Sequence, residues 1–154
     1  MQNLYEPPQA ELALEAAEVR PPAYQLYSVT EIRVATFFGA LFGGGVIMTM
    51  NYRRTGQSDE TRRASLWTLL GTLGLIGLAL ALPYDVPSLV FSIAEAVLMV
   101  QLGKHLQRHE ISRHLDRGGR LASSWGAAGI GILAILPIIT VLMAFVLIFP
   151  ELFA

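Results

Sequence analysis

Four long apolar blocks constrain this chain more than any other feature of its sequence. They cover residues 34–50, 66–82, 86–102 and 121–149, and a single carboxylate, Glu95, is the only acidic residue within them. A helix at the surface of a soluble domain keeps a polar face toward water, and these blocks have none. The hydrocarbon core of a bilayer is about 30 Å thick, and roughly 20 apolar helical residues cross it. The blocks therefore predict an all-α membrane protein with four transmembrane helices in a bundle with short loops.

The composition agrees with a membrane protein of one domain. The 154 residues are 53% hydrophobic and 15% charged, whereas soluble domains are about 25% charged. Cysteine is absent, which excludes disulfides and thiolate metal sites. We expect an acidic N-terminal tail followed by a four-helix transmembrane domain. Their predicted bounds are 1–27 for the tail and 28–154 for the domain, with helices at about 29–52, 66–82, 87–103 and 124–149. The two inner helices are the shortest, and a partly interfacial hairpin is the alternative for them.

The distribution of basic residues predicts an orientation. Nine of the 11 Lys and Arg residues follow the first or the third apolar block, namely Arg53, Arg54, Arg62, Arg63, Lys104, Arg108, Arg113, Arg117 and Arg120. Short basic loops stay on the cytoplasmic side of a membrane. The tail lacks the basic and apolar regions of a signal peptide, so the first helix is expected to act as its own insertion signal. The pattern predicts a multi-pass membrane protein with both basic loops in the cytoplasm and both termini on the outer side.

The first apolar segment carries a helix start signal. Ser28 and Glu31 have the spacing of a capping box, so this helix should begin at Val29. It would end near Asn51 and Tyr52. At 1.5 Å per residue, such a helix covers about 34 Å, which is enough to span the bilayer.

Glycines are frequent in three of the predicted helices. The helix-packing candidates are Gly39, Gly43, Gly44, Gly71, Gly74 and Gly126. In lipid, small residues let helix backbones approach closely, and helix association relies on that packing. Packing within the four-helix bundle is the plainer interpretation. Formation of a homo-oligomer, or binding of a partner's helix, is the alternative.

Glu95 is the one ionisable residue well inside an apolar segment. A carboxylate at membrane depth is costly, which suggests a function such as the handling of a proton or a cation. The structural interpretation is a protonated glutamate that is hydrogen-bonded to Ser92, Thr72 or Gln101.

The basic segment 104–120 is the remaining candidate for chemistry. His105, His109 and Asp116 lie on one face of a predicted helix, a spacing that suits a divalent metal when a third ligand converges. The surrounding cations, however, favour a basic amphipathic helix on anionic headgroups. The proposed membrane-surface residues are Arg53, Arg54, Lys104, Arg108, Arg113 and Arg117. We expect no nucleic acid, metal or cofactor, and no enzyme activity, since no catalytic or phosphate-binding motif is visible.

One stretch resembles the opening of a family of small uncharacterised bacterial membrane proteins. The resemblance rests on a Leu-Tyr-Ser cap, an Ile-x-x-Ala-Thr-Phe-x-Gly core and an Asn-Tyr exit. In this chain the matching residues are Leu26, Tyr27, Ser28, Ile32, Ala35, Thr36, Phe37, Gly39, Asn51 and Tyr52. Family members often have a proline in the small-residue patch, which this chain lacks. The resemblance implies a bacterial membrane setting and no particular activity. Together with the charge pattern, it leads us to expect a bacterial inner membrane with both termini on the periplasmic side.

These features predict a non-catalytic integral membrane protein that acts through helix–helix association. Its partners would be the lipid bilayer and either a membrane protein or further copies of itself. An accessory subunit or an immunity-type partner of a membrane protein would fit. The alternative is a small oligomeric transporter or channel that uses Glu95.

Overall fold

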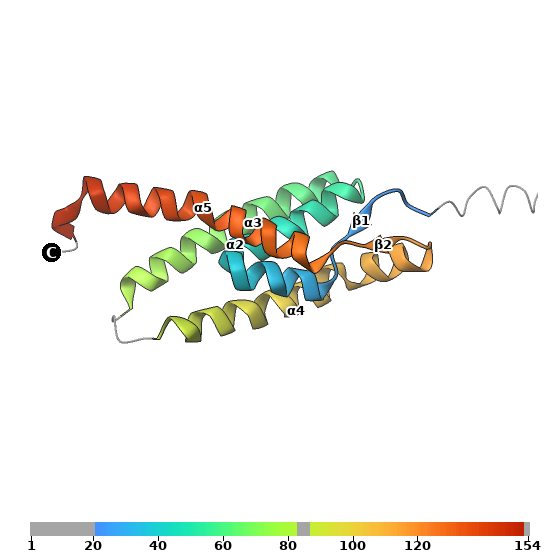
Figure 1. Cartoon of the computed structure of the whole chain (residues 1–154), viewed down its shortest axis with the longest axis horizontal. Helices are drawn as coiled ribbons and strands as arrows, with labels where there is room; N and C mark the ends of the chain where they lie inside the picture. Colours follow the sequence, from blue (N-terminus) through green and yellow to red (C-terminus); the bar gives the residue numbers. More distant parts are fainter. Residues whose placement is uncertain (1–20, 83–86, 153–154) are drawn as a thin grey trace, which may run out of the picture.

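The computed structural model describes residues 21–82 and 87–152 (Figure 1). Four long apolar helices pack together, and each is long and apolar enough to be a candidate membrane span, which confirms the predicted fold class. The elements are β1 (Gln25–Leu26), α2 (Val29–Arg54), α3 (Ser58–Ala81), α4 (Ser88–Asp116), β2 (Arg120–Leu121), α5 (Ser124–Ile148) and a 3₁₀ turn (Pro150–Leu152). Most of the predicted acidic tail and of the turn between the second and third helices lies outside the described residues.

Helix α2 is folded back on itself. Gly39 (φ −122°, ψ 17°) and Ala40 (φ 52°, ψ −161°) leave the helical conformation and divide α2 into halves 29–38 and 41–54. A straight helix would place Tyr27 and Asn51 about 36 Å apart. Instead, the Tyr27 amide donates to Oδ1 of Asn51 at 2.9 Å. In Figure 1 the blue first half leaves β1, and the teal second half returns to the same end of the molecule. We call α2 the re-entrant hairpin and Gly39–Ala40 its tip.

The hairpin differs from the expectation of one continuous helix over residues 29–52. Its first half has about 10 helical residues and reaches about 15 Å, which is half of a hydrocarbon core of about 30 Å. The residues before and after this segment, which were expected on opposite sides of a membrane, lie next to each other in the structure. Arg54 donates from Nη1 to the carbonyl of Gln25 at 2.6 Å, and Gln25 is paired with Arg120 in the β1–β2 ladder. Residues 25–28 therefore lie at the same end of the molecule as Arg54 and Arg120.

The other three helices run the length of the molecule. We call the end with Arg53, Arg54 and β2 the basic end, and the opposite end, where α3 stops and α4 starts, the far end. Helix α3 leaves the basic end, α4 returns to it, and α5 leaves it again (Figure 1). Each packs against the hairpin, whereas these three helices make hardly any contact with one another over the described ranges.

Two helices extend beyond their predicted bounds at the basic end. Helix α3 begins at Ser58 rather than residue 66, and α4 continues to Asp116 rather than stopping at residue 103. The segment 104–116 is therefore the end of α4 and not a separate helix on the membrane surface. It stays helical because Gln107, Ile111 and His114 are buried against the hairpin and its flanking strands. Gly118 has a positive φ of 74°, which suits the turn after the helix.

Candidate functional site

The tip of the hairpin is held by Glu95. A helix break leaves backbone N–H groups without intrahelical partners at the start of the second half. Oε2 of Glu95, on α4, accepts a hydrogen bond from the Leu41 amide at 2.8 Å. The start of a helix also carries a partial positive charge, which favours a carboxylate. Glu95 therefore caps the second half of the hairpin.

Two of the expected partners of Glu95, Thr72 and Gln101, form no recorded hydrogen bond with it. The Thr72 hydroxyl donates to the carbonyl of Thr68 within α3 at 2.8 Å, and Gln101 is exposed. The partner that sequence reasoning missed is a backbone amide, which becomes available only because α2 is broken.

A cavity of about 330 Å³ lies beyond the tip. Glu95, Thr72 and Ala40 line it together with apolar side chains of α3, α4 and α5. Among the described residues that line it, Glu95 alone has an ionisable side chain. The tip thus combines a discontinuous helix, a carboxylate and an open space.

The base of the hairpin is closed by a buried polar network. Nδ2 of Asn51 donates to the Tyr27 carbonyl at 2.8 Å and to Oε1 of Gln107 at 2.9 Å. Nε2 of Gln107 donates in turn to the Met48 carbonyl at 2.8 Å. Asn51 is 3% exposed and Gln107 is 1% exposed. The network joins both ends of the hairpin to α4, and sequence analysis did not single out Gln107.

Glu31 joins the hairpin to α5. It completes the capping box, in which its Oε2 accepts from the Ser28 amide at 2.9 Å. Its Oε1 accepts from the Ser124 hydroxyl at 2.9 Å. Ser123 caps α5 by accepting from the Trp125 amide at 3.2 Å. One carboxylate thereby fixes the starts of two helices relative to each other.

The glycine candidates fall into two groups. A Cβ atom at Gly39 would lie 2.4 Å from the Gly131 carbonyl oxygen of α5, and one at Gly43 would lie 2.5 Å from the Ala35 carbonyl oxygen. A Cβ at Gly44 would lie 2.1 Å from Oγ1 of Thr36. These glycines let the hairpin halves approach each other and α5. Gly71 is packed less closely, because a Cβ atom there would lie 3.2 Å from Cδ2 of Leu41.

The second group contains Gly74 and Gly126. A Cβ at Gly74 would meet nothing within 4 Å, and one at Gly126 would lie 3.6 Å from the Tyr27 hydroxyl. Among the described residues, no helix packs closely against Gly74 or Gly126.

The candidate membrane-surface residues gather at the basic end. Arg53, Lys104, Arg108, Arg113 and Arg117 are exposed, and Arg113 forms an ion pair with Glu110 on the same helix. Arg54 differs, because it donates to Gln25 and its guanidinium lies 5.1 Å from the centre of the Tyr27 ring. Arg54 thus stabilises the base of the hairpin.

Searches against protein-family models, curated proteins and solved structures find no match for this chain.

Proposed function

We propose that this is a non-catalytic integral membrane protein that binds a membrane helix of another chain along α3. The observation that carries the proposal is the exposure of nearly all of α3. Among its described residues Thr68 alone is buried, although the helix is a candidate span of 24 residues. Over the described residues, α3 makes hardly any contact with α4 or α5.

The far half of α3 offers the surface that membrane helices use. Gly74 and Gly77 both have open space around their Cα atoms. Helices in lipid associate through close van der Waals packing, and small residues permit it. The glycines of α2 are already used inside the chain, so α3 is the surface on which a partner's helix gains most. An accessory subunit or an immunity-type protein needs such a surface and no catalytic group.

The proposed setting is a bacterial inner membrane, in line with the family resemblance. Positive charge near short loops favours the cytoplasmic side, so the basic end would lie in the cytoplasm. Residues 25–28 would then be cytoplasmic as well, and the 3₁₀ turn after α5 would be periplasmic. This orientation replaces the one with both termini outside.

Purification in a mild detergent tests the proposed association. We expect the purified protein to be part of a complex larger than the 16.8 kDa chain. A cysteine introduced at Gly77 should crosslink to the same partner in native membranes. Gly74→Leu should dissociate the complex, because its side chain holds the helices apart. The matched control is Val141→Phe, which adds bulk to an exposed position of α5. A monomer in every condition would contradict the proposal.

A second function, proton or cation transport, is favoured by the geometry of the tip. Discontinuous helices near the bilayer midplane form ion and substrate sites in transporters, and an intramembrane carboxylate is a common element of such sites. Here the hairpin tip, Glu95 and the cavity adjoin one another.

Flux measurements on reconstituted vesicles separate the two functions. Glu95→Gln keeps an oxygen that accepts from the Leu41 amide, so this variant should fold. Transport through Glu95 predicts flux in the wild type and none in Glu95→Gln. Absence of flux from the wild type leaves Glu95 as a cap, and Glu95→Leu should then cost about 1–2 kcal/mol, the scale of a hydrogen bond within a membrane.

A further inference from the structure

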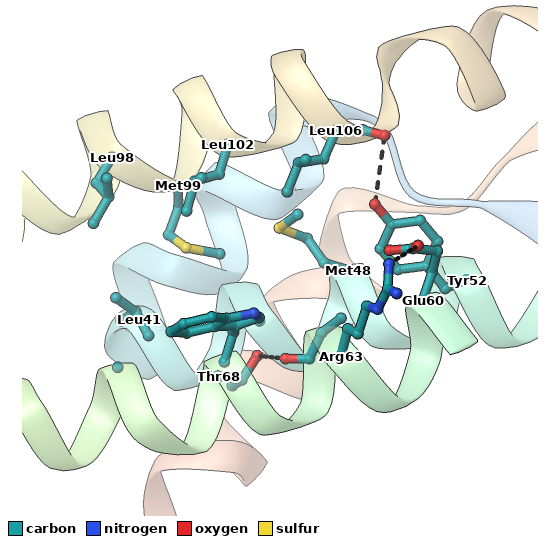
Figure 2. Close-up of a pocket in the computed structure, with 14 residues that line it drawn as sticks. Leu41, Met48, Tyr52, Glu60, Arg63, Thr68, Leu98, Met99, Leu102 and Leu106 are labelled. Atoms are coloured by element: carbon teal, nitrogen blue, oxygen red, sulfur yellow. Dashed lines mark hydrogen bonds and ion pairs between the residues drawn. The ribbon is translucent and has the colours of Figure 1, made fainter. Parts of the chain in front are cut away.

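An apolar groove of about 410 Å³ runs between α3 and α4, with the second half of α2 as its floor. Figure 2 shows Leu98, Leu102 and Leu106 of α4 along one side and Met48 of α2 at the floor. The groove exists because α3 and α4 each pack on the hairpin and not on each other. In a bilayer, a groove between these two candidate membrane spans would open toward lipid.

The length of the groove corresponds to one leaflet of a bilayer. Its lining on α4 extends from Leu98 to Leu106, which is about 12 Å of helix. Half of a hydrocarbon core is about 15 Å thick. Near the hairpin tip the groove is narrowed where Leu41 approaches Gly71. A transmembrane helix needs the full thickness, whereas an acyl chain of one lipid occupies a single leaflet.

The mouth of the groove lies at the basic end and is polar. Arg63 and Trp67 of α3 are both exposed there, and tryptophan favours the headgroup layer. Nη1 of Arg63 pairs with Oε1 of Glu60 at 3.0 Å, but the side chains are 71% and 44% exposed. Exposed pairs of this kind contribute little, so the guanidinium can exchange Glu60 for a phosphate at small cost. The surrounding cations make this end complementary to an anionic headgroup.

We propose that the groove binds one acyl chain of an anionic phospholipid from the leaflet at the basic end. The acyl chain lies against Met48 and Leu102, and the lipid phosphate contacts Arg63. This site is separate from the face of α3 that carries Gly74, and it does not depend on the proposed helix partner.

Fluorescence quenching by brominated lipids tests the site. The chain has 2 tryptophans, so Trp125→Phe leaves Trp67 as the sole reporter. The variant is reconstituted into phosphatidylcholine vesicles that contain a small fraction of brominated phosphatidylglycerol, or the same fraction of brominated phosphatidylcholine. The proposal predicts stronger quenching by the anionic lipid than by the zwitterionic one. Equal quenching by both lipids would overturn it.

Two pairs of variants distinguish the groove from general attraction to a charged surface. Arg63→Gln should abolish the preference, while Arg62→Gln should keep it, because Arg62 is exposed and does not line the groove. Ala64→Phe should reduce quenching by filling the groove, while Leu66→Phe should not, because Leu66 lies outside it. Equal loss of preference in both arginine variants would show bulk electrostatic attraction and would contradict the site.

Discussion

The half of the molecule at the basic end and the half beyond the hairpin tip are built differently. In the basic half the hairpin fills the centre, and α3, α4 and α5 pack around it. Buried polar groups such as Asn51 and Gln107 lie there. In the far half the three helices run with little contact between them, and large apolar side chains such as Leu80, Leu89 and Leu147 are exposed.

The difference teaches how a broken helix is tolerated at membrane depth. Non-helical backbone occurs within a membrane only where protein or a water-filled cavity surrounds it. The tip satisfies this rule, because Glu95 accepts from Leu41 and Gly131 covers Gly39. The hairpin replaces direct contacts between the spanning helices, so stability should be concentrated in the basic half. The far half remains available for other molecules.

The largest expected effect is at Gly39. In Gly39→Ala the new Cβ would meet Gly131 backbone atoms at 2.4 and 2.8 Å, and backbone atoms cannot move aside. We expect a loss on the order of 3 kcal/mol, or no folded protein. Gly74→Ala is the matched change in the far half, where nothing lies within 4 Å, and it should not destabilise. Thermal unfolding in detergent measures both, and similar melting of the two variants would contradict the comparison.

A smaller effect is expected in the buried network. Gln107→Leu leaves the Met48 carbonyl and one Asn51 N–H without their partner. Unsatisfied buried groups cost about 1–3 kcal/mol. Gln101→Leu makes the same change on the same helix at an exposed position and should stay within about 0.5 kcal/mol. Denaturant titration of both variants compares them, and equal stabilities would mean that the network does not hold the hairpin.

The smallest effect on stability is expected at Ala40, where a substitution by glycine should stabilise the protein. Its φ of 52° and ψ of −161° lie in a region that is essentially reserved for glycine. Ala40→Gly should therefore stabilise the protein by up to about 1 kcal/mol. Ala94→Gly, at an exposed helical position of α4, should destabilise it by about 0.5–1 kcal/mol. If both variants lost stability equally in the same melting assay, Ala40 would have to be helical.

The helices themselves were predictable because their signals are local. The length of the apolar runs predicted the four helices, and the Ser28 cap predicted the start of α2. The end of α4 was missed because its polar turns are held by burial of Gln107 and His114. The start of α3 was missed because its first two turns are polar. Gln107 is polar in sequence and buried only through Asn51 and Met48.

The break in α2 was not predictable from length and apolarity, since both suit a spanning helix. It depends on contacts between distant residues, such as Gly39 with Gly131 and Leu41 with Glu95. Two signals in combination could have indicated it. Glycines interrupt the middle of the first block, and a carboxylate in a later block lacks a charged partner. A broken helix supplies the backbone donors that such a carboxylate requires.

Accessibility of single cysteines tests the re-entrant hairpin most directly. The chain contains no cysteine, and Ala23, Asp59 and Glu151 are exposed positions before α2, after it and beyond α5. An impermeant thiol reagent is applied to sealed membranes of known orientation. The re-entrant hairpin predicts that cysteines at Ala23 and Asp59 are labelled from the same side and a cysteine at Glu151 from the other. Labelling of Ala23 and Asp59 from opposite sides would show that residues 29–54 cross the bilayer and would contradict the hairpin.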